Sequence, residues 1–456
     1  MHYEKFPDGT VKCIEDEIPF ELPEGWSWTR LGSLFSTITG STPSTKDASL
    51  YGDEYPFYKP TDLDAGFDVC VSEDTVSEKG YKNGRILPMY SVLVTCIGAT
   101  IGKTGYIKNS GICNQQINAI LPNTFILPEY TYFCMCSEFE QQQIWTNSSA
   151  TTLPILNKSK FDILFFPVPP KAQQTRTVER IKELLHFVEI IQQEKRTLQE
   201  TIKLTKSKIL DLTIRGKLVP QDPNDEPASV LLERIRSEKE ELIKQGKIKR
   251  DKKESVIFKG DDNSYYLRTG GVEESLENWR FDDLPETWKI CCLGELCDYG
   301  DCINVNTEDI AEDAWILDLE DIEKDTGMVL KKVTKAQRNS VSTKHKFHSG
   351  QVLYSKLRPY LNKVVLSDAD GYCTSEILPL EFKNCVLPEY ARYYLMSGTF
   401  ITYANHCSYG VKMPRLGTTD GKKAIFSLPP LSEQKCIVET IDFCFMQLNK
   451  ISEALA

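Results

Sequence analysis

Short apolar runs separated by turn-forming residues fill the first third of the chain. Tyr90 to Ile97 and Ile163 to Phe166 are rich in β-branched and aromatic residues, and turn signals such as Asn83-Gly84 separate the runs. Runs of this length, bounded by glycine and asparagine, predict strands. Residues 128–143 instead have the pattern of a helix. Residues 26 to about 167 are therefore predicted to form one β-rich globular unit.

The pattern changes after Pro170, where a long helical stretch begins. Residues 171–217 contain no proline, and no glycine before Gly216. Gly216 and the prolines that follow it end this helix. A second, very polar helix is predicted from about Ala228 to Gln245. In the first helix, positions at alternating spacings of three and four predict a coiled-coil seam, if the polar Lys195 and Thr205 are allowed within it. Its apolar residues are Val188, Ile191, Leu198, Ile202, Ile209 and Leu212.

A second β-rich unit spans about Leu284 to Ser427, and another helix begins after Pro430. This last helix covers roughly 25 residues, about half the length of the first one. Two such helices predict an antiparallel coiled coil that carries the two units. The seam of the last helix consists of Ile437, Ile441, Cys444, Leu448 and Ile451.

The two units are copies of one module. The motif Leu-Pro-Glu-x-Trp occurs at 22–26 and 284–288, and Leu-Pro-Glu-Tyr occurs at 127–130 and 387–390. A Pro-Pro pair followed by a glutamine occurs at 169–174 and again at 429–434. The offsets are nearly constant (284 − 22 = 262, 387 − 127 = 260, 429 − 169 = 260). A repeat at a fixed period indicates two copies of one structural unit.

These boundaries predict an α+β protein with a pseudo-twofold internal repeat. Two similar, mixed, β-rich domains are separated by long antiparallel coiled-coil helices. The predicted segments are a lead-in at 1–22, a first domain at 23–168, a central helix at 169–217, a polar helix and linker at 218–280, a second domain at 281–428 and a C-terminal helix at 429–456.

Composition and charge narrow the functional classes. The chain has 456 residues, of which 41% are hydrophobic and 26% charged, and its net charge is −11. No stretch approaches the ~20 apolar residues that span a bilayer, and residues 1–17 lack a secretory signal, which predicts a cytoplasmic protein. The fifteen cysteines lie mostly in apolar runs, so they are interpreted as core residues rather than zinc ligands. The negative net charge is evidence against a simple nucleic-acid coat protein. It is not evidence against a protein that reads a DNA groove with locally clustered cations.

Residues 98–104 come close to a phosphate-binding loop, because they end in Gly-Lys-Thr. This stretch is one residue short of that motif, and the second copy, at 356–364, lacks its glycines. The lysine alone persists, as Lys103 and Lys363. A persistent cation beside variable neighbours favours a DNA-facing loop, and a plain hairpin turn with a solvated lysine is the alternative.

Signatures of catalysis are missing from the sequence. It contains no GxSxG, HExxH, GxGxxG or protein-kinase motif, and no Asn/Asp-Pro-Pro-aromatic motif. The acidic residues Asp318, Glu320 and Asp321 are interpreted as structural or as half-site contacts. The chain is therefore predicted to be non-catalytic, without a cofactor or metal of its own.

Polar loops differ between the copies, while the landmark motifs do not. Asn, Gln, Arg, Lys, Ser and Thr are the side chains that pair with base edges, so these loops are candidates for DNA reading. Ordinary drift after duplication would give the same appearance. The candidate residues are Ser41, Thr42, Lys46, Lys103, Gln115, Gln116, Thr151 and Thr152 in the first unit, and Asn304, Asn306, Lys356, Arg358, Lys363, Tyr409, Lys412 and Arg415 in the second.

The whole chain resembles the specificity subunit of Type I restriction-modification systems. The resemblance rests on the Leu-Pro-x-x-Trp openings, on the Pro-Pro-x-x-(Glu/Gln)-Gln start of each helix, on Ser-Lys-Leu-Arg-Pro-Tyr at 355–360, and above all on residues 214–232. It implies that each β-rich unit is a target-recognition domain for one half of a split DNA site. The helices would then set the spacing between the half-sites.

The resemblance also implies the partners. Two modification subunits would dock on the helical regions and methylate adenine with S-adenosylmethionine. Restriction subunits would use ATP and Mg²⁺ for translocation and cleavage of double-stranded DNA. A specificity module for another DNA-modifying assembly, or a two-headed structural adaptor without DNA binding, would show the same duplicated architecture.

Overall fold

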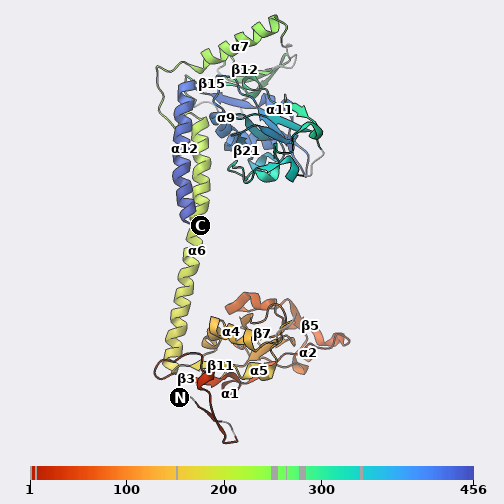
Figure 1. Ribbon diagram of the computed structural model, residues 1–456, viewed down its shortest axis with the longest axis vertical. Coiled ribbons are helices and arrows are strands. Elements are labelled where there is room, and N and C mark those ends of the chain that lie inside the picture. The colour runs from red at the N-terminus through yellow and green to blue at the C-terminus, as the bar shows by residue number, and fades with distance from the viewer. Residues whose placement is uncertain are drawn as a thin grey trace. The chain divides into compact units, whose positions relative to one another are not determined.

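The computed structural model describes residues 3–5, 8–149, 153–247, 255–262, 264–276, 284–338 and 342–455. It divides into two compact units, Met1–Gln192 and Gln193–Ala456, here called unit 1 and unit 2. The boundary falls inside one continuous helix, α6 (Lys171–Ile214) (Figure 1). Within the described ranges, no helix is both long and apolar enough to cross a membrane.

Unit 1 is built around a four-stranded antiparallel sheet with the strand order β4-β10-β7-β8. Its central strands β7 and β10 are buried along their whole length, as the apolar run at 90–97 predicts. A three-stranded sheet, β6-β5-β9, and two strand pairs, β3-β11 and β1-β2, complete the unit. The strands are β1 Tyr3–Lys5, β2 Val11–Cys13, β3 Ser27–Arg30, β4 Thr37–Thr39, β5 Tyr51–Tyr58, β6 Asp74–Val76, β7 Val92–Thr95, β8 Thr104–Tyr106, β9 Ile112–Cys113, β10 Ile117–Ile120 and β11 Phe165–Val168; the α-helices before α6 are α1 Leu31–Leu34, α2 Glu78–Asn83, α3 Pro128–Met135, α4 Glu138–Asn147 and α5 Lys158–Asp162.

Unit 2 repeats this plan with sheets of different size. Strands β21-β20-β23 form one sheet and β16-β19-β22-β17-β18 form another, while β15-β26 and β24-β25 are pairs. A further sheet, β12-β13-β14, follows the polar helix α7. The strands are β12 Ser255–Lys259, β13 Tyr265–Thr269, β14 Val272–Ser275, β15 Lys289–Cys292, β16 Ile303–Val305, β17 Trp315–Leu317, β18 Val333–Thr334, β19 Lys344–Phe347, β20 Val352–Ser355, β21 Val364–Leu366, β22 Gly371–Thr374, β23 Ile377–Leu380, β24 Ser408–Tyr409, β25 Arg415–Leu416 and β26 Ile425–Leu428; the α-helices are α7 Ala228–Lys244, α8 Leu293–Leu296, α9 Pro388–Leu395, α10 Gly398–His406, α11 Thr418–Lys423 and α12 Leu431–Ala454.

The repeated sequence landmarks meet in space within each unit. In unit 1, the buried Gln174 side chain accepts from the Leu127 N–H at 2.8 Å and donates to the Pro169 carbonyl at 3.0 Å. In unit 2, Gln434 makes the same two bonds to Leu387 and Pro429, at the same distances. The repeated glutamine therefore joins the start of the long helix to the loop before the Leu-Pro-Glu-Tyr helix. It also satisfies backbone groups that would be costly to bury unpaired.

A repeated tyrosine adds one further contact to those of the glutamine. The glutamine and tyrosine contacts of each unit are here called the frame. The Tyr130 hydroxyl donates to the carbonyl of Pro167 on β11, and the Tyr390 hydroxyl donates to the carbonyl of Ser427 on β26, both at 3.0 Å. The strand pairs β3-β11 and β15-β26 have matching antiparallel registers. The internal repeat predicted from the sequence is confirmed by these shared contacts.

The single helix predicted over residues 128–143 was wrong, because the structure has two helices there. Helix α3 ends at Met135, and α4 begins at Glu138. The Ser137 hydroxyl accepts from the Glu140 N–H at 3.3 Å, which is an N-cap contact that starts a new helix. Unit 2 breaks at the equivalent residue, Ser397, which caps α10 through the Phe400 N–H.

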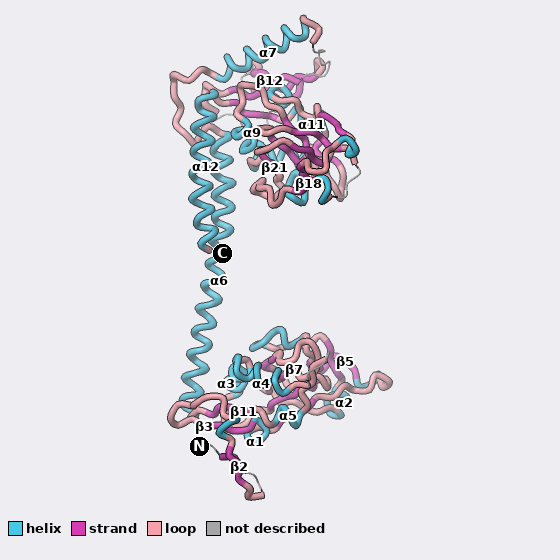
Figure 2. The backbone as a smooth tube through the Cα atoms, viewed as in Figure 1, coloured by secondary structure: helices cyan, strands magenta, loops and turns pink. Residues whose placement is uncertain are grey.

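Helices α6 and α12 pair antiparallel inside unit 2 (Figures 1 and 2). The Lys206 ammonium donates to the Asn449 side chain at 2.6 Å, and the Ser427 hydroxyl donates to the Ile214 carbonyl at 2.9 Å. From Lys206 to Ile214 along α6, the contacted residue moves back from Asn449 near the end of α12 to Ser427 on β26, just before α12 begins, which confirms the predicted antiparallel helices. Gly216, two residues after the end of α6, has a φ of +63°.

Only part of the predicted α6 seam is covered in the described structure. Ile202 is buried, whereas Val188, Ile191 and Leu198 are 48%, 66% and 40% exposed. These side chains continue the seam spacing toward the start of α6. The N-terminal part of α6 therefore presents an apolar stripe, defined here by Leu184, Val188, Ile191 and Leu198.

Candidate nucleic-acid interface

In unit 1, the loop after β4 lies directly against the loop before β10. Gly40 permits this approach, because a Cβ atom at that position would lie 2.0 Å from the Asn114 carbonyl oxygen. The Ser41 N–H then donates to the Cys113 carbonyl at 2.8 Å. The two predicted polar loops are thus brought together by a backbone contact that only glycine allows.

The side chains of these loops hold one another. The Thr42 hydroxyl donates to Gln115 Oε1 at 2.5 Å, and Asn114 Nδ2 donates to Gln116 Oε1 at 2.9 Å. Gln115 and Thr42 are exposed, and so is Lys46. This cluster presents amide and hydroxyl groups, which can both donate to and accept from base edges.

A third loop of unit 1 joins the same region. The Gly98 N–H donates to the Pro154 carbonyl at 3.0 Å, and the backbones of Ile97 and Ile155 pair in a single β-bridge. A Cβ atom built on Gly98 would lie 3.9 Å from Gln116 Nε2. The predicted residues Thr151 and Thr152 lie outside the described residues, immediately before this contact.

The two equivalent lysines, Lys103 and Lys363, are both occupied by acceptors of their own unit. The Lys103 ammonium lies 2.6 Å from Asp64 Oδ1, and the Lys363 ammonium donates to the Leu319 carbonyl at 2.6 Å. Burial lowers the pKa of Lys363, and the negative charge of Asp321 opposes this effect. A phosphate contact by either lysine would have to replace these bonds, so that role stays a prediction.

In unit 2, the equivalent loops are joined by ionic contacts. Glu376, which is 260 residues after Gln116, holds Arg415 through both carboxylate oxygens, with the Arg415 Nη2–Oε1 distance at 2.8 Å. The Lys356 N–H donates to the Glu376 carbonyl, and the Leu416 N–H donates to the Lys356 carbonyl, both at 3.0 Å. The Arg415 guanidinium is thus a clamp that fixes this loop pair.

Sequence reasoning listed Arg415 as a candidate DNA contact and missed its partner Glu376. The residues equivalent to this pair in unit 1 are Gln116 and Ile155, both uncharged. In unit 2 these two positions carry opposite charges, whereas both are uncharged in unit 1. This paired difference between the copies was the sequence signal that could have identified the clamp.

The hairpin formed by β24 and β25 carries the exposed candidates of unit 2. Tyr409 is 62% exposed, and Lys412 at the hairpin tip is also exposed. Asn304 is exposed on β16, the edge strand of the five-stranded sheet, and Asn306, the residue after β16, is also exposed.

Lys356, whose backbone bonds to both loops of the clamp, also lies near the five-stranded sheet that carries Asn304. Asn304 pairs in register with His345 on the neighbouring strand β19. Burial lowers the pKa of His345, and the nearby Lys356 charge acts in the same direction. Lys356 therefore lies near β19, the strand that pairs with the Asn304 strand.

The acidic residues Asp318, Glu320 and Asp321 surround one arginine, Arg338. The Arg338 Nη1 atom lies 2.5 Å from Asp318 and 3.3 Å from Glu320, and its Nη2 atom contacts the fully buried Asp321. This arrangement supports the structural interpretation of the acidic cluster. Among the described residues, no group of three or more His, Cys, Asp or Glu side chains is placed to hold a metal ion.

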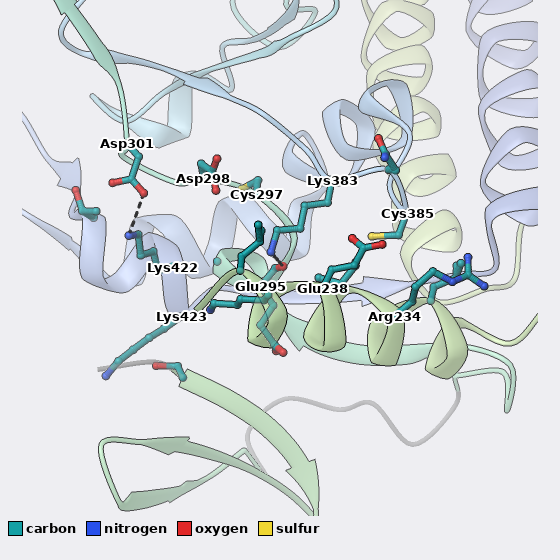
Figure 3. A pocket seen from close by; sticks show the side chains of 18 of the residues that line it. Arg234, Glu238, Glu295, Cys297, Asp298, Asp301, Lys383, Cys385, Lys422 and Lys423 are labelled. Carbon is teal, nitrogen blue, oxygen red and sulfur yellow. Dashed lines mark hydrogen bonds and ion pairs between the residues drawn. The ribbon is translucent and has the colours of Figure 1, made fainter. Parts of the chain in front are cut away.

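A cavity of about 930 Å³ lies elsewhere in unit 2, beside α7, α8 and α11 (Figure 3). Lys383 donates to the Glu295 carbonyl at 2.8 Å there, and Lys422 lies 3.6 Å from Asp301. Its charged side chains are of both signs, and several of them are engaged by ion pairs or hydrogen bonds within unit 2. None of the predicted DNA-contacting residues lines this cavity.

Comparison with known families agrees with this duplicated architecture. The sequence model of the Type I restriction modification DNA specificity domain matches residues 23–200 and 285–454. The match covers more than half of the chain, once in each repeat. The chain therefore belongs to the Type I restriction-modification specificity family and carries two copies of its domain.

Individual relatives extend over nearly the whole chain. The Type I restriction enzyme EcoDI specificity subunit of Escherichia coli is 22% identical, across 95% of this chain and 84% of its own. The EcoAI specificity subunit of Escherichia coli is 24% identical, across 96% of this chain and 80% of its own.

Two solved structures share the fold. The HsdS subunit from Thermoanaerobacter tengcongensis gives a TM-score of 0.54 at 16% identity, with coverage of 96% of this chain and 93% of that one. A chain from a structural study of the assembly and conformational transition of the type I R-M system gives 0.60 at 16% identity, with coverage of 96% and 94%.

Proposed function

We propose that this chain reads a bipartite DNA sequence for a Type I restriction-modification complex, with one half-site for each unit. The observation that carries this proposal is the contrast between a repeated frame and unrepeated loops. Gln174 and Gln434 make the same bonds, whereas Gln116 and Glu376 do not. Two domains of the specificity family, with one frame and two sets of loop side chains, suit two different half-sites.

The loops that meet at the candidate interface would supply the base contacts. In unit 1 these are the loops at 39–46, 96–104 and 114–118, and in unit 2 the loops at 300–306, 355–363 and 407–416. Amide groups pair well with adenine, and arginine or lysine pairs well with guanine. We therefore expect the two half-sites to differ in sequence.

The apolar stripe of α6 is the proposed docking surface for modification subunits. Exposed apolar side chains at coiled-coil spacing favour a helical partner. These partners would bring S-adenosylmethionine and adenine methylation, and restriction subunits would bring ATP and Mg²⁺. The chain itself would be non-catalytic, and the complex would act on double-stranded DNA in the cytoplasm.

The proposed docking can be tested by a triple variant, Leu184→Ser, Val188→Ser and Ile191→Ser. Because these side chains are exposed, the unfolding free energy of the chain should change little, while co-purification with the cognate modification subunit should be lost. A matched change of the polar neighbours Gln192→Ser and Gln193→Ser should retain the complex. Retention of the complex by the triple variant would contradict this docking surface.

The proposed function itself is tested by methylome sequencing of cells that express the chain with its cognate modification subunit. Methylated adenines in a split motif with a fixed gap are expected. If the complex assembles but no motif appears, the chain is a two-headed adaptor without DNA reading, and the proposal is wrong.

A further inference from the structure

Two residues of unit 2 have a positive φ at positions where unit 1 has glycine. Arg358 and Asn362 both have a φ of +50° and flank the short 3-10 helix η7 (Pro359–Leu361). The residues 260 positions earlier are Gly98 and Gly102, with φ values of +104° and +88°. The left-handed region is unfavourable for a residue with a Cβ atom. Unit 2 therefore carries an arginine where the fold itself favours glycine.

The guanidinium of Arg358 is poorly satisfied by the protein. Its Nη2 atom donates to the Lys412 carbonyl at 3.5 Å, the outer limit of a hydrogen bond. Its Nε atom is buried and has no hydrogen-bond partner within the described parts of the chain. Arginine has five N–H donors, and a buried donor without an acceptor is unfavourable. Arg415 differs, because Glu376 engages it at both oxygens.

The surroundings of Arg358 leave room for acceptors from outside. A cavity of about 280 Å³ is lined by Arg358 and Lys363, by Glu320 and Met413, and by four further residues. Glu320 lies 3.3 Å from Arg338, and no ion pair between Glu320 and Arg358 occurs in the described structure. An open cavity beside a strained and unsatisfied arginine suggests a ligand that brings acceptor atoms. Backbone outliers of this kind cluster at functional sites.

We propose that Arg358 is the principal DNA anchor of unit 2, and that its unfavourable backbone is retained for this contact. Its guanidinium would bind a pair of acceptor atoms on DNA, either the O6 and N7 atoms of a guanine or two phosphate oxygens. The inference rests on the proposed function, since it assumes that unit 2 reads DNA. It separates Arg358 from Lys103, Lys363 and Arg415, whose charged groups the protein already engages, and from Lys46 and Lys412, which are exposed.

The test compares Arg358→Gly with Arg358→Ala in the complete complex with the modification subunit. Arg358→Gly removes the guanidinium and relieves the backbone, so its Tm should equal or exceed that of the wild type. Arg358→Ala keeps the unfavourable φ, so its Tm should lie below that of Arg358→Gly. Both variants should bind the methylated motif at least tenfold more weakly. Asn362 is not one of the candidate DNA contacts, because its side chain is buried and donates to the Met396 carbonyl. Asn362→Gly relieves this other left-handed residue and should leave DNA affinity within twofold of the wild type.

Two further readouts identify the acceptor. If Arg358 binds a guanine, Arg358→Lys should accept other bases at one position of one half-site, while the other half-site is unchanged. If it binds phosphate, Arg358→Gly should weaken all sequences alike and lower the slope of log affinity against log salt by about one. Arg358→Lys should then retain most of the affinity and the full motif.

The inference is overturned if Arg358→Gly binds DNA as tightly as the wild type, or if its Tm falls below that of Arg358→Ala. Absence of any bipartite motif for the wild-type complex would instead overturn the proposed function. The two failures are therefore distinguishable in the same set of experiments.

Discussion

Gln174 and Gln434 make identical contacts in the two units, while Gln116 and Glu376, separated by the same 260 residues, do not. Gln116 is held by Asn114 among neutral amides, and Glu376 clamps Arg415 with a carboxylate. The first pair lies at the base of the frame and the second pair lies in the loops. The comparison teaches that the duplication preserves the contacts that hold each unit together and changes the chemistry of its candidate interface.

The largest effect on stability is expected where unit 2 has charges that unit 1 lacks. Arg338→Leu would leave the buried Asp321 with only the exposed Lys331, 3.7 Å away, as its cation, and breaking a buried pair in this way costs about 3–5 kcal/mol. Denaturant titration of the chain should show this loss. The exposed pair between Lys332 and Asp368 offers a control, since Lys332→Leu should cost no more than about 1 kcal/mol. Equal losses for the two variants would show that the Arg338 cluster is not a buried one.

The shared frame predicts equal losses in both units. Gln174→Leu and Gln434→Leu would each leave a buried N–H and at least one buried carbonyl unpaired, at a cost of about 2–4 kcal/mol. The exposed Gln142→Leu should change the unfolding free energy by less than about 0.5 kcal/mol. A large loss for one frame glutamine and none for the other would break the equivalence of the units.

A smaller, pH-dependent difference is expected from Glu140, whose equivalent in unit 2 is Phe400. Glu140 is fully buried, and burial raises its pKa well above the ordinary value, although the contacts with Cys134 and Gln143 oppose this shift. A raised pKa means that the folded protein holds the proton more tightly than the unfolded chain. The stabilisation of the folded state by the protonated Glu140 is fully present below a pH of about 4.3. It is lost as the pH rises toward the folded pKa.

Glu140→Gln should remove this loss of unfolding free energy with rising pH, which has a slope of at most about 1.4 kcal/mol per pH unit. Unfolding free energies between pH 4 and pH 9 check the prediction. Glu138→Gln, a change in the exposed first turn of the same helix, is the control and should keep the wild-type profile. An unchanged profile for Glu140→Gln would mean that Glu140 does not titrate with folding.

The smallest effect is expected from a single exposed cation of the candidate interface. Lys412→Ala should lower the slope of log DNA affinity against log salt by about one, because one phosphate contact would be lost. Lys289 is exposed on β15, away from the hairpin, and Lys289→Ala should leave the slope unchanged. If both variants behave alike, Lys412 does not face DNA.

Much of the fold follows from local sequence. Gly216 predicted the end of α6, and its left-handed φ lets the Lys217 N–H bond back to the Leu212 carbonyl at 3.0 Å. The repeated Pro-Pro and Leu-Pro-Glu-Tyr motifs predicted the two units, because each motif lies at a fixed contact of the frame. The break between α3 and α4 was missed, since a serine N-cap within a helical pattern is a weak signal.

The candidate site was predicted less completely, because contacts between distant residues decide it. The sequence placed Lys103 and Lys363 in equivalent loops, but it could not show that Asp64 and the Leu319 carbonyl engage them. It suggested that the glycines of 98–104 were simply lost in the second copy. Only the backbone shows that Arg358 and Asn362 keep a positive φ at these two positions.

The most direct test of the account is methylome sequencing with loop variants of one unit at a time. Gln115→Ala changes an exposed amide of unit 1, and Arg358→Gly changes unit 2. The account predicts a split motif in which Gln115→Ala alters specificity only in one half, whereas Arg358→Gly leaves the specificity of that half unchanged. A continuous motif, or the same half altered by both variants, would contradict the assignment of one half-site to each unit.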